Sequence, residues 1–93
     1  MTIEDIIAAI LEQASKVAAY HEHMATNPGL SPEIVASHQT IANVIDSYIR
    51  SIKEEKDAVS IRKLCRVIGL EKLLEAYEKA IVPRARRDRG YEM

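Results

Sequence analysis

Histidine and cysteine are the residues of this chain whose side chains could bind a metal ion or transfer a proton. The chain contains three His and one Cys. His21 and His23 lie two positions apart in the segment YHEH, so on a helix their side chains point about 200° apart and cannot chelate one ion together. Cys65 has no second cysteine with which to form an intramolecular disulfide, which suits a reducing compartment. We therefore predict no metal site and no cofactor.

A second histidine pair, His21 and His38, comes from two different predicted helices. His21 and His38 both occupy inward positions of two helices that are predicted to be antiparallel neighbours, so their rings should face each other. We predict a pH-sensitive pair, because two rings that are both protonated repel each other and stability should then fall on acidification. The alternative is two half-buried rings that are satisfied by backbone or tyrosine hydroxyl groups and have no regulatory role.

Arginines gather in the second part of the chain. Residues 1–57 carry four basic and nine acidic residues, whereas residues 58–93 carry nine basic and five acidic residues. This asymmetry indicates either a solubilising C-terminus or a binding surface for nucleic acid, an anionic ligand or an acidic protein. The candidate binding residues are Arg62, Arg66, Arg84, Arg86, Arg87 and Arg89.

The segment LCRVIGLEKLLEAY, residues 64–77, resembles the helix-turn-helix of bacterial repressors, with a small residue, Cys65, four positions before the turn glycine Gly69. The resemblance implies a second helix that reads DNA bases. However, Glu75 and Glu78 stand where that family usually has apolar residues, and Glu71 would lie beside a phosphate and be repelled by it. We therefore favour a helix-Gly-helix corner that closes a bundle over DNA recognition.

The sequence shows no pattern that is typical of an enzyme. No serine or cysteine has a convincing base nearby, and the chain has no glycine-rich phosphate loop. We expect no enzymatic activity.

Hydrophobic periodicity predicts an all-α protein. Helical spacing runs from Ile3 to Ala25, and a second helix begins at Pro32, behind the N-cap Ser31. The charged segment KEEKD ends this helix near residues 54–57, although one continuous helix through this region remains an alternative. A third helix over 58–68 leads to Gly69, and a fourth follows until Pro83 stops it.

The fold class is a small antiparallel bundle of three to four helices, built from a long helical hairpin and a helix-Gly-helix corner. Residues 1–82 form the bundle domain, and residues 83–93 form a flexible basic C-terminal tail. In the hairpin, facing positions should have residue numbers that add to 59. The predicted pairs are Met24 with Val35, His21 with His38, Ala14 with Ile45, Ile10 with Ile49 and Ile7 with Ile52.

Apolar positions exceed what such a bundle can bury. We expect this surplus to be covered by a second copy, so we predict a homo-oligomer, most simply a two-fold dimer. The surplus residues are Ile6, Leu11, Val44, Val59 and Val67. The sequence predicts a cytoplasmic, non-enzymatic interaction module without membrane contact, such as an inhibitor, adaptor or regulator of another protein. The alternative is a binder of nucleic acid or a small anionic ligand through the basic C-terminal half.

Overall fold

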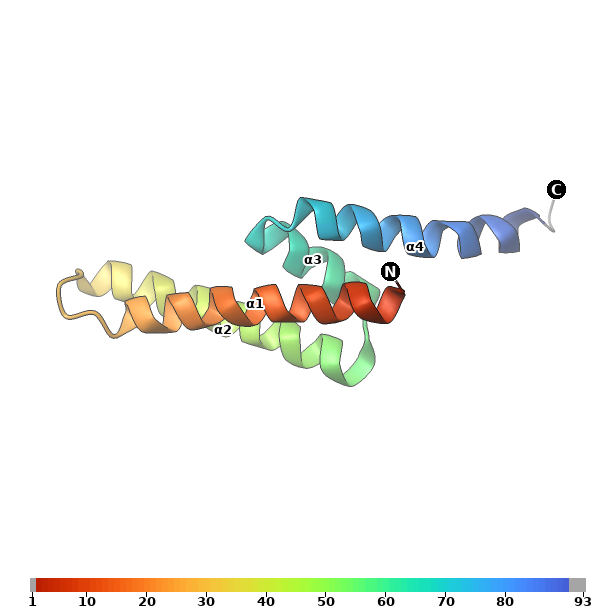
Figure 1. The fold of residues 1–93 in the computed structure, drawn as a ribbon. Coiled ribbons are helices and arrows are strands. Elements are labelled where there is room, and N and C mark those ends of the chain that lie inside the picture. The colour runs from red at the N-terminus through yellow and green to blue at the C-terminus, as the bar shows by residue number, and fades with distance from the viewer. Residues whose placement is uncertain (1, 91–93) are drawn as a thin grey trace.

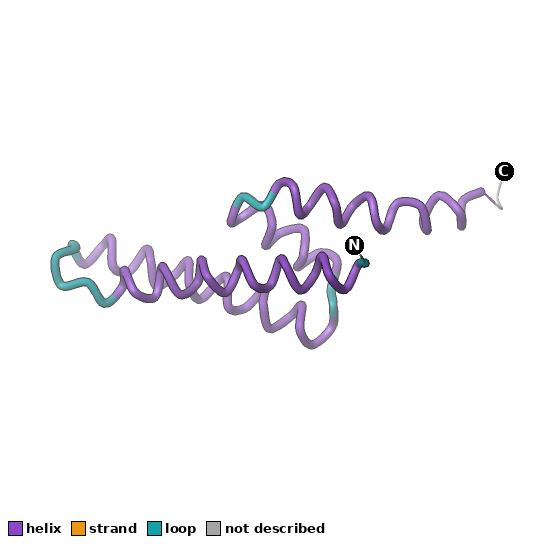
Figure 2. Tube along the Cα trace, in the orientation of Figure 1, coloured by secondary structure: helices purple, strands orange, loops and turns teal. Residues whose placement is uncertain are grey.

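The computed structural model describes the backbone of residues 2–90 and the side chains of residues 2–81. Within these residues the chain forms four helices and no strand (Figure 2). This confirms the predicted all-α class. The helices are α1 (Ile3–Ala25), α2 (Pro32–Glu55), α3 (Ala58–Ile68) and α4 (Glu71–Gly90).

The hairpin helices begin at the predicted caps. The Thr2 side chain accepts a hydrogen bond from the backbone N–H of Asp5, and the Asp5 carboxylate accepts one from the N–H of Thr2. This reciprocal pair satisfies two backbone donors at the start of α1. Ser31 accepts from the N–H of Ile34, and Pro32 occupies the first turn of α2, where its missing N–H costs no hydrogen bond.

The two remaining connections are short and depend on the left-handed backbone region. Lys56 ends α2 with φ of 51°, and Asp57 then caps α3 by accepting a hydrogen bond from the N–H of Val59. This confirms the predicted break near residues 54–57. Gly69 ends α3 with φ of 73°, a conformation that costs glycine little because it has no Cβ.

The end of α4 differs from the prediction. The helix does not stop at Pro83 but continues to Gly90. A proline removes one backbone donor, and the Arg and Ala residues that follow have high helix propensity, so the helical backbone continues through it. The last turns of α4 extend beyond the other three helices (Figure 1). The division into a bundle over 1–82 and a tail over 83–93 stays a prediction.

The core forms where α3 and α4 pack on the hairpin. Its fully buried side chains come from α1, α2 and α3, and Tyr77 of α4 closes it. In the covered part of the hairpin, the predicted pairs Ala14 with Ile45, Ile10 with Ile49 and Ile7 with Ile52 are buried, which agrees with the predicted register. The core residues are Ile6, Ile7, Ile10, Ala14, Ala18, Ile45, Ile49, Ile52, Ile61, Leu64, Cys65 and Tyr77.

The hairpin is too long for the other helices to cover. The 11 residues of α3 span about 16 Å, whereas the 24 residues of α2 span about 36 Å. The chain turns back at Gly69, so α3 and α4 lie over one part of the hairpin and leave its other end uncovered (Figure 1).

This arrangement corrects three burial predictions. Ile6 was expected to be surplus, but it is buried in the core because α1 faces both α2 and the α3–α4 layer. Helical spacing in the sequence also predicts Ile34 and Ile41 on the inner side of the second helix, but they are 46% and 37% exposed because they lie past the α3–α4 corner. None of the described helices is sufficiently long and apolar to cross a membrane.

Candidate interaction surface

The His21 and His38 side chains meet between α1 and α2. Their Nδ1 atoms are 2.8 Å apart, and both residues are half-buried. Tyr20 sets its ring edge-on to both imidazoles, with centroid distances of 5.2 Å and 6.2 Å. This contact confirms that the two histidines face each other, as the register predicted. Their sensitivity to pH stays a prediction.

The separation of these nitrogens identifies the interaction as a hydrogen bond. A neutral imidazole has one donor and one acceptor nitrogen, so one ring donates from Nδ1 and the other accepts. Two imidazole ligands of a tetrahedral zinc ion would lie about 3.3 Å apart, given Zn–N distances of about 2.0–2.1 Å. His23 is exposed at the end of α1. Among the described residues, no group of three or more His, Cys, Asp or Glu is placed to hold a metal ion.

The basic residues do not gather into one site within the described side chains. Arg62 forms an ion pair with Glu78 of α4, and this hydrogen-bonded carboxylate raises the pKa of the guanidinium. In the structure Arg62 joins α3 to α4, and its predicted part in an anion-binding surface stays a prediction. Arg66 is exposed. The other predicted binding residues are Arg84, Arg86, Arg87 and Arg89, whose side chains lie outside the described part of the chain.

The α3–α4 corner also differs from a DNA-reading unit in the placement of its acidic residues. Glu71 and Glu75 are exposed on α4, and Glu75 pairs with Lys79 at 3.1 Å. Glu78, in contrast, turns toward α3 to meet Arg62. Arg62 and Glu78 therefore link α3 to α4 across this corner.

The surface feature that sequence reasoning did not single out is the uncovered end of the hairpin, residues 17–45, which we call the distal lobe. Of the six large hydrophobic residues that are exposed in the described side chains, four lie here. They are Tyr20 at 55%, Ile34 at 46%, Ile41 at 37% and Val44 at 40% exposed. The other two, Val59 and Val67, lie on α3.

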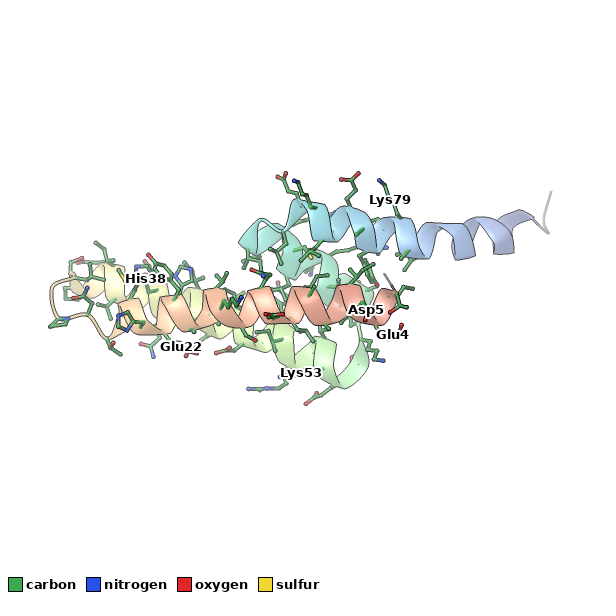
Figure 3. The ribbon with its side chains drawn as sticks, in the orientation of Figure 1. Glu4, Asp5, Glu22, His38, Lys53 and Lys79 are labelled. Carbon is green, nitrogen blue, oxygen red and sulfur yellow. The ribbon has the colours of Figure 1, made fainter. Side chains whose placement is uncertain are left out.

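The distal lobe is also poor in charge. Asp, Glu, Lys and Arg make up 29% of the whole chain, but Glu22 and Glu33 are the only such residues among positions 17–45. Glu22 lies on the opposite side of the hairpin from His38 (Figure 3). There the hydrogen-bonded carboxyl of Asp46 raises the pKa of Glu22, and repulsion between the two acids adds to this shift. The exposed apolar residues of α2 in the distal lobe therefore lie within a run, residues 34–45, that contains no Asp, Glu, Lys or Arg.

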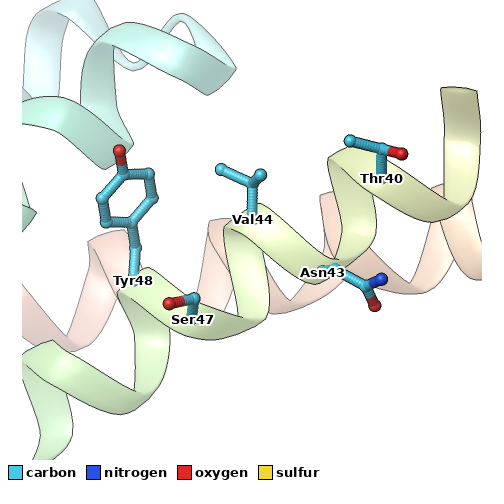
Figure 4. Close-up of a pocket in the computed structure, with 5 residues that line it drawn as sticks. All are labelled: Thr40, Asn43, Val44, Ser47 and Tyr48. Atoms are coloured by element: carbon cyan, nitrogen blue, oxygen red, sulfur yellow. The ribbon is translucent and has the colours of Figure 1, made fainter.

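The spacing along α2 shows how this surface is built. Positions 38, 42, 45, 49 and 52 form the seam toward α1, while positions 34, 37, 41, 44 and 48 form a second seam with coiled-coil spacing. Tyr48, at one end of the second seam, packs against the core. Val44 and Tyr48 project to the same side of α2 beside a surface hollow of about 410 Å³ (Figure 4). The second seam thus begins inside the fold and continues uncovered over the distal lobe.

These features define a small all-α bundle whose hairpin carries an exposed, uncharged apolar seam. Comparisons of the chain with models of protein families, with curated proteins and with solved structures found no match. A functional proposal therefore rests on the physical properties of this surface.

Proposed function

We propose that this chain is a non-enzymatic helical interaction module that binds protein through its distal lobe and also self-associates. The observation that carries the proposal is the uncovered seam of α2, where Ile34, Ile41 and Val44 are exposed within a run, residues 34–45, that contains no Asp, Glu, Lys or Arg. Interface cores are depleted of charged residues, whereas the free surface of a small domain is normally rich in them. An inhibitor, adaptor or regulator acts by such occupancy and needs no catalytic group.

Site-specific photo-crosslinking in the host tests this role. A benzophenone amino acid at position 41 should give defined protein adducts, because this position lies at the centre of the exposed seam. The same amino acid at position 67 is the matched control, since Val67 is also exposed but lies on α3. Equal labelling at both positions, or no protein adduct at position 41, would contradict the proposal.

The alternative function is binding of nucleic acid or an anionic ligand by the basic C-terminal half. Of the basic residues that would contact such a ligand, Arg62 is paired with Glu78. Binding of a mixed-sequence DNA duplex that weakens steeply as salt rises would favour this alternative, because phosphate contacts depend on salt and an apolar interface barely does.

A further inference from the structure

We infer that the occupant of the distal lobe is the distal lobe of a second copy, bound antiparallel across a two-fold axis that passes near Ile41. This inference rests on the proposed function and names its partner. The two hairpins would then form an intermolecular four-helix bundle in which the uncovered seam of each α2 faces its counterpart.

The absence of charge favours an identical partner. In a two-fold contact the same patch of both copies is used. A residue near the axis meets the identical residue of the other copy, so a charge there meets a like charge. Residues 34–45 of α2 contain no Asp, Glu, Lys or Arg. A second copy therefore meets no repulsion on this face, whereas an acidic or basic partner would find no opposite charge to pair with.

The shape of the molecule favours the same arrangement. The α3–α4 layer covers one end of the hairpin and stops at the Gly69 corner, which leaves a step above the distal lobe (Figure 1). The step extends along α2 from about Tyr48 to the hairpin turn, which is about 27 Å for 18 residues. The distal lobe of the second copy would fill this step. It has the same length as the step, because the step and the lobe correspond to the same part of α2. In an antiparallel pair, each lobe fills the step of the other copy.

The size of the contact indicates which class of complex to expect. Two helices side by side are about 20 Å wide, so the face covers about 500 Å² per copy and about 1,000 Å² in the pair. This lies at the lower end of specific interfaces, where weak and transient complexes are found. We expect a reversible dimer with a dissociation constant of tens to hundreds of micromolar.

Sedimentation equilibrium of the purified full chain over a concentration range from about 5 μM to 1 mM measures this association. The average mass should rise from the 10.4 kDa of the monomer toward twice that value. Ile41→Glu should weaken the dimer at least tenfold, since it places like charges next to the axis. Val67→Glu is the matched control, and it should leave the association unchanged. Circular dichroism checks that both variants are folded.

A charge exchange separates direct contact from loss of folding. Ile41→Glu and Ile41→Lys should each be monomeric alone, and their equimolar mixture should form a heterodimer. A chain that stays monomeric at 1 mM, equal effects of the variants at positions 41 and 67, or a mixture that does not associate would each overturn the self-pairing. Photo-crosslinking of position 41 to a different protein, with a monomeric purified chain, would overturn self-pairing alone. Absence of both signals would also remove the proposed function.

Discussion

Replacement of Ile45 by alanine tests the central packing of the hairpin. Ile45 is 0% exposed and belongs to the seam of α2 that faces α1. Ile41 lies one turn earlier on the same helix but is 37% exposed. The same substitution at both positions changes side-chain size and helix propensity equally, so the difference between the two variants isolates the effect of burial.

The expected loss of stability follows from the burial of each side chain. Ile45→Ala removes three buried carbon groups worth about 0.8 kcal/mol each. A residual cavity of roughly 40 Å³ adds about 1 kcal/mol, and the higher helix propensity of alanine returns about 0.4 kcal/mol. The net cost is about 3 kcal/mol. Ile41→Ala leaves no enclosed cavity and loses only part of the transfer energy, which gives about 1 kcal/mol.

Urea unfolding followed by circular dichroism measures both values. The protein should be kept at low micromolar concentration, where pairing of distal lobes does not contribute. With an m value of about 1.5 kcal/mol/M, Ile45→Ala should lower the midpoint by about 2 M, and Ile41→Ala by less than about 1 M. If the two variants differ by less than about 0.5 kcal/mol at an unchanged m value, the assignment of the inner and outer seams of α2 is wrong.

Three further predictions concern the connections and the core. Lys56→Gly should stabilise the fold by up to about 1 kcal/mol and Gly69→Ala should destabilise it by about 1 kcal/mol, because both positions have left-handed φ; equal signs in urea unfolding would contradict this. Hydrogen bonds from the Ser60 hydroxyl and a backbone N–H lower the pKa of Asp57, so its contribution to stability is complete above the unfolded pKa of about 3.9 and is lost as pH falls through the lowered value. Between pH 5 and pH 2 the parent should therefore lose more stability than Asp57→Asn, and parallel curves would refute the assignment. Burial raises the pKa of the Cys65 thiol, so iodoacetamide should modify it only as fast as the chain unfolds, and rapid labelling of the folded protein would show that α3 is more open than described.

Local sequence signals predicted the helices and most of their ends. Ser31 with Pro32, Asp57 and Gly69 act through hydrogen bonds and backbone angles within a few residues, so their effects can be read without knowing the fold. Pro83 was the exception. A proline predicts a helix end, but residues with high helix propensity on both sides maintain the helical backbone of α4.

The candidate site was predictable only in part. The contact of His21 with His38 followed from the hairpin register, because the turn fixes which residues face each other. The pairing of Arg62 with Glu78 did not, since it depends on the direction in which α4 leaves the corner. The uncharged run over residues 34–45 was visible in the sequence, but it does not reveal whether its apolar positions lie inside a bundle or on its surface.

The sequence by itself determined that this chain forms helices, where most of them begin and end, and which hairpin residues meet, because these properties depend on near neighbours and on one short turn. Only the tertiary structure decided which apolar side chains are covered. Ile6 and Ile34 both lie on apolar helix faces, yet one is 3% exposed and the other 46%. The difference arises because α3 is less than half as long as α2 and the chain turns back at Gly69, so burial depends on how far a neighbouring helix reaches.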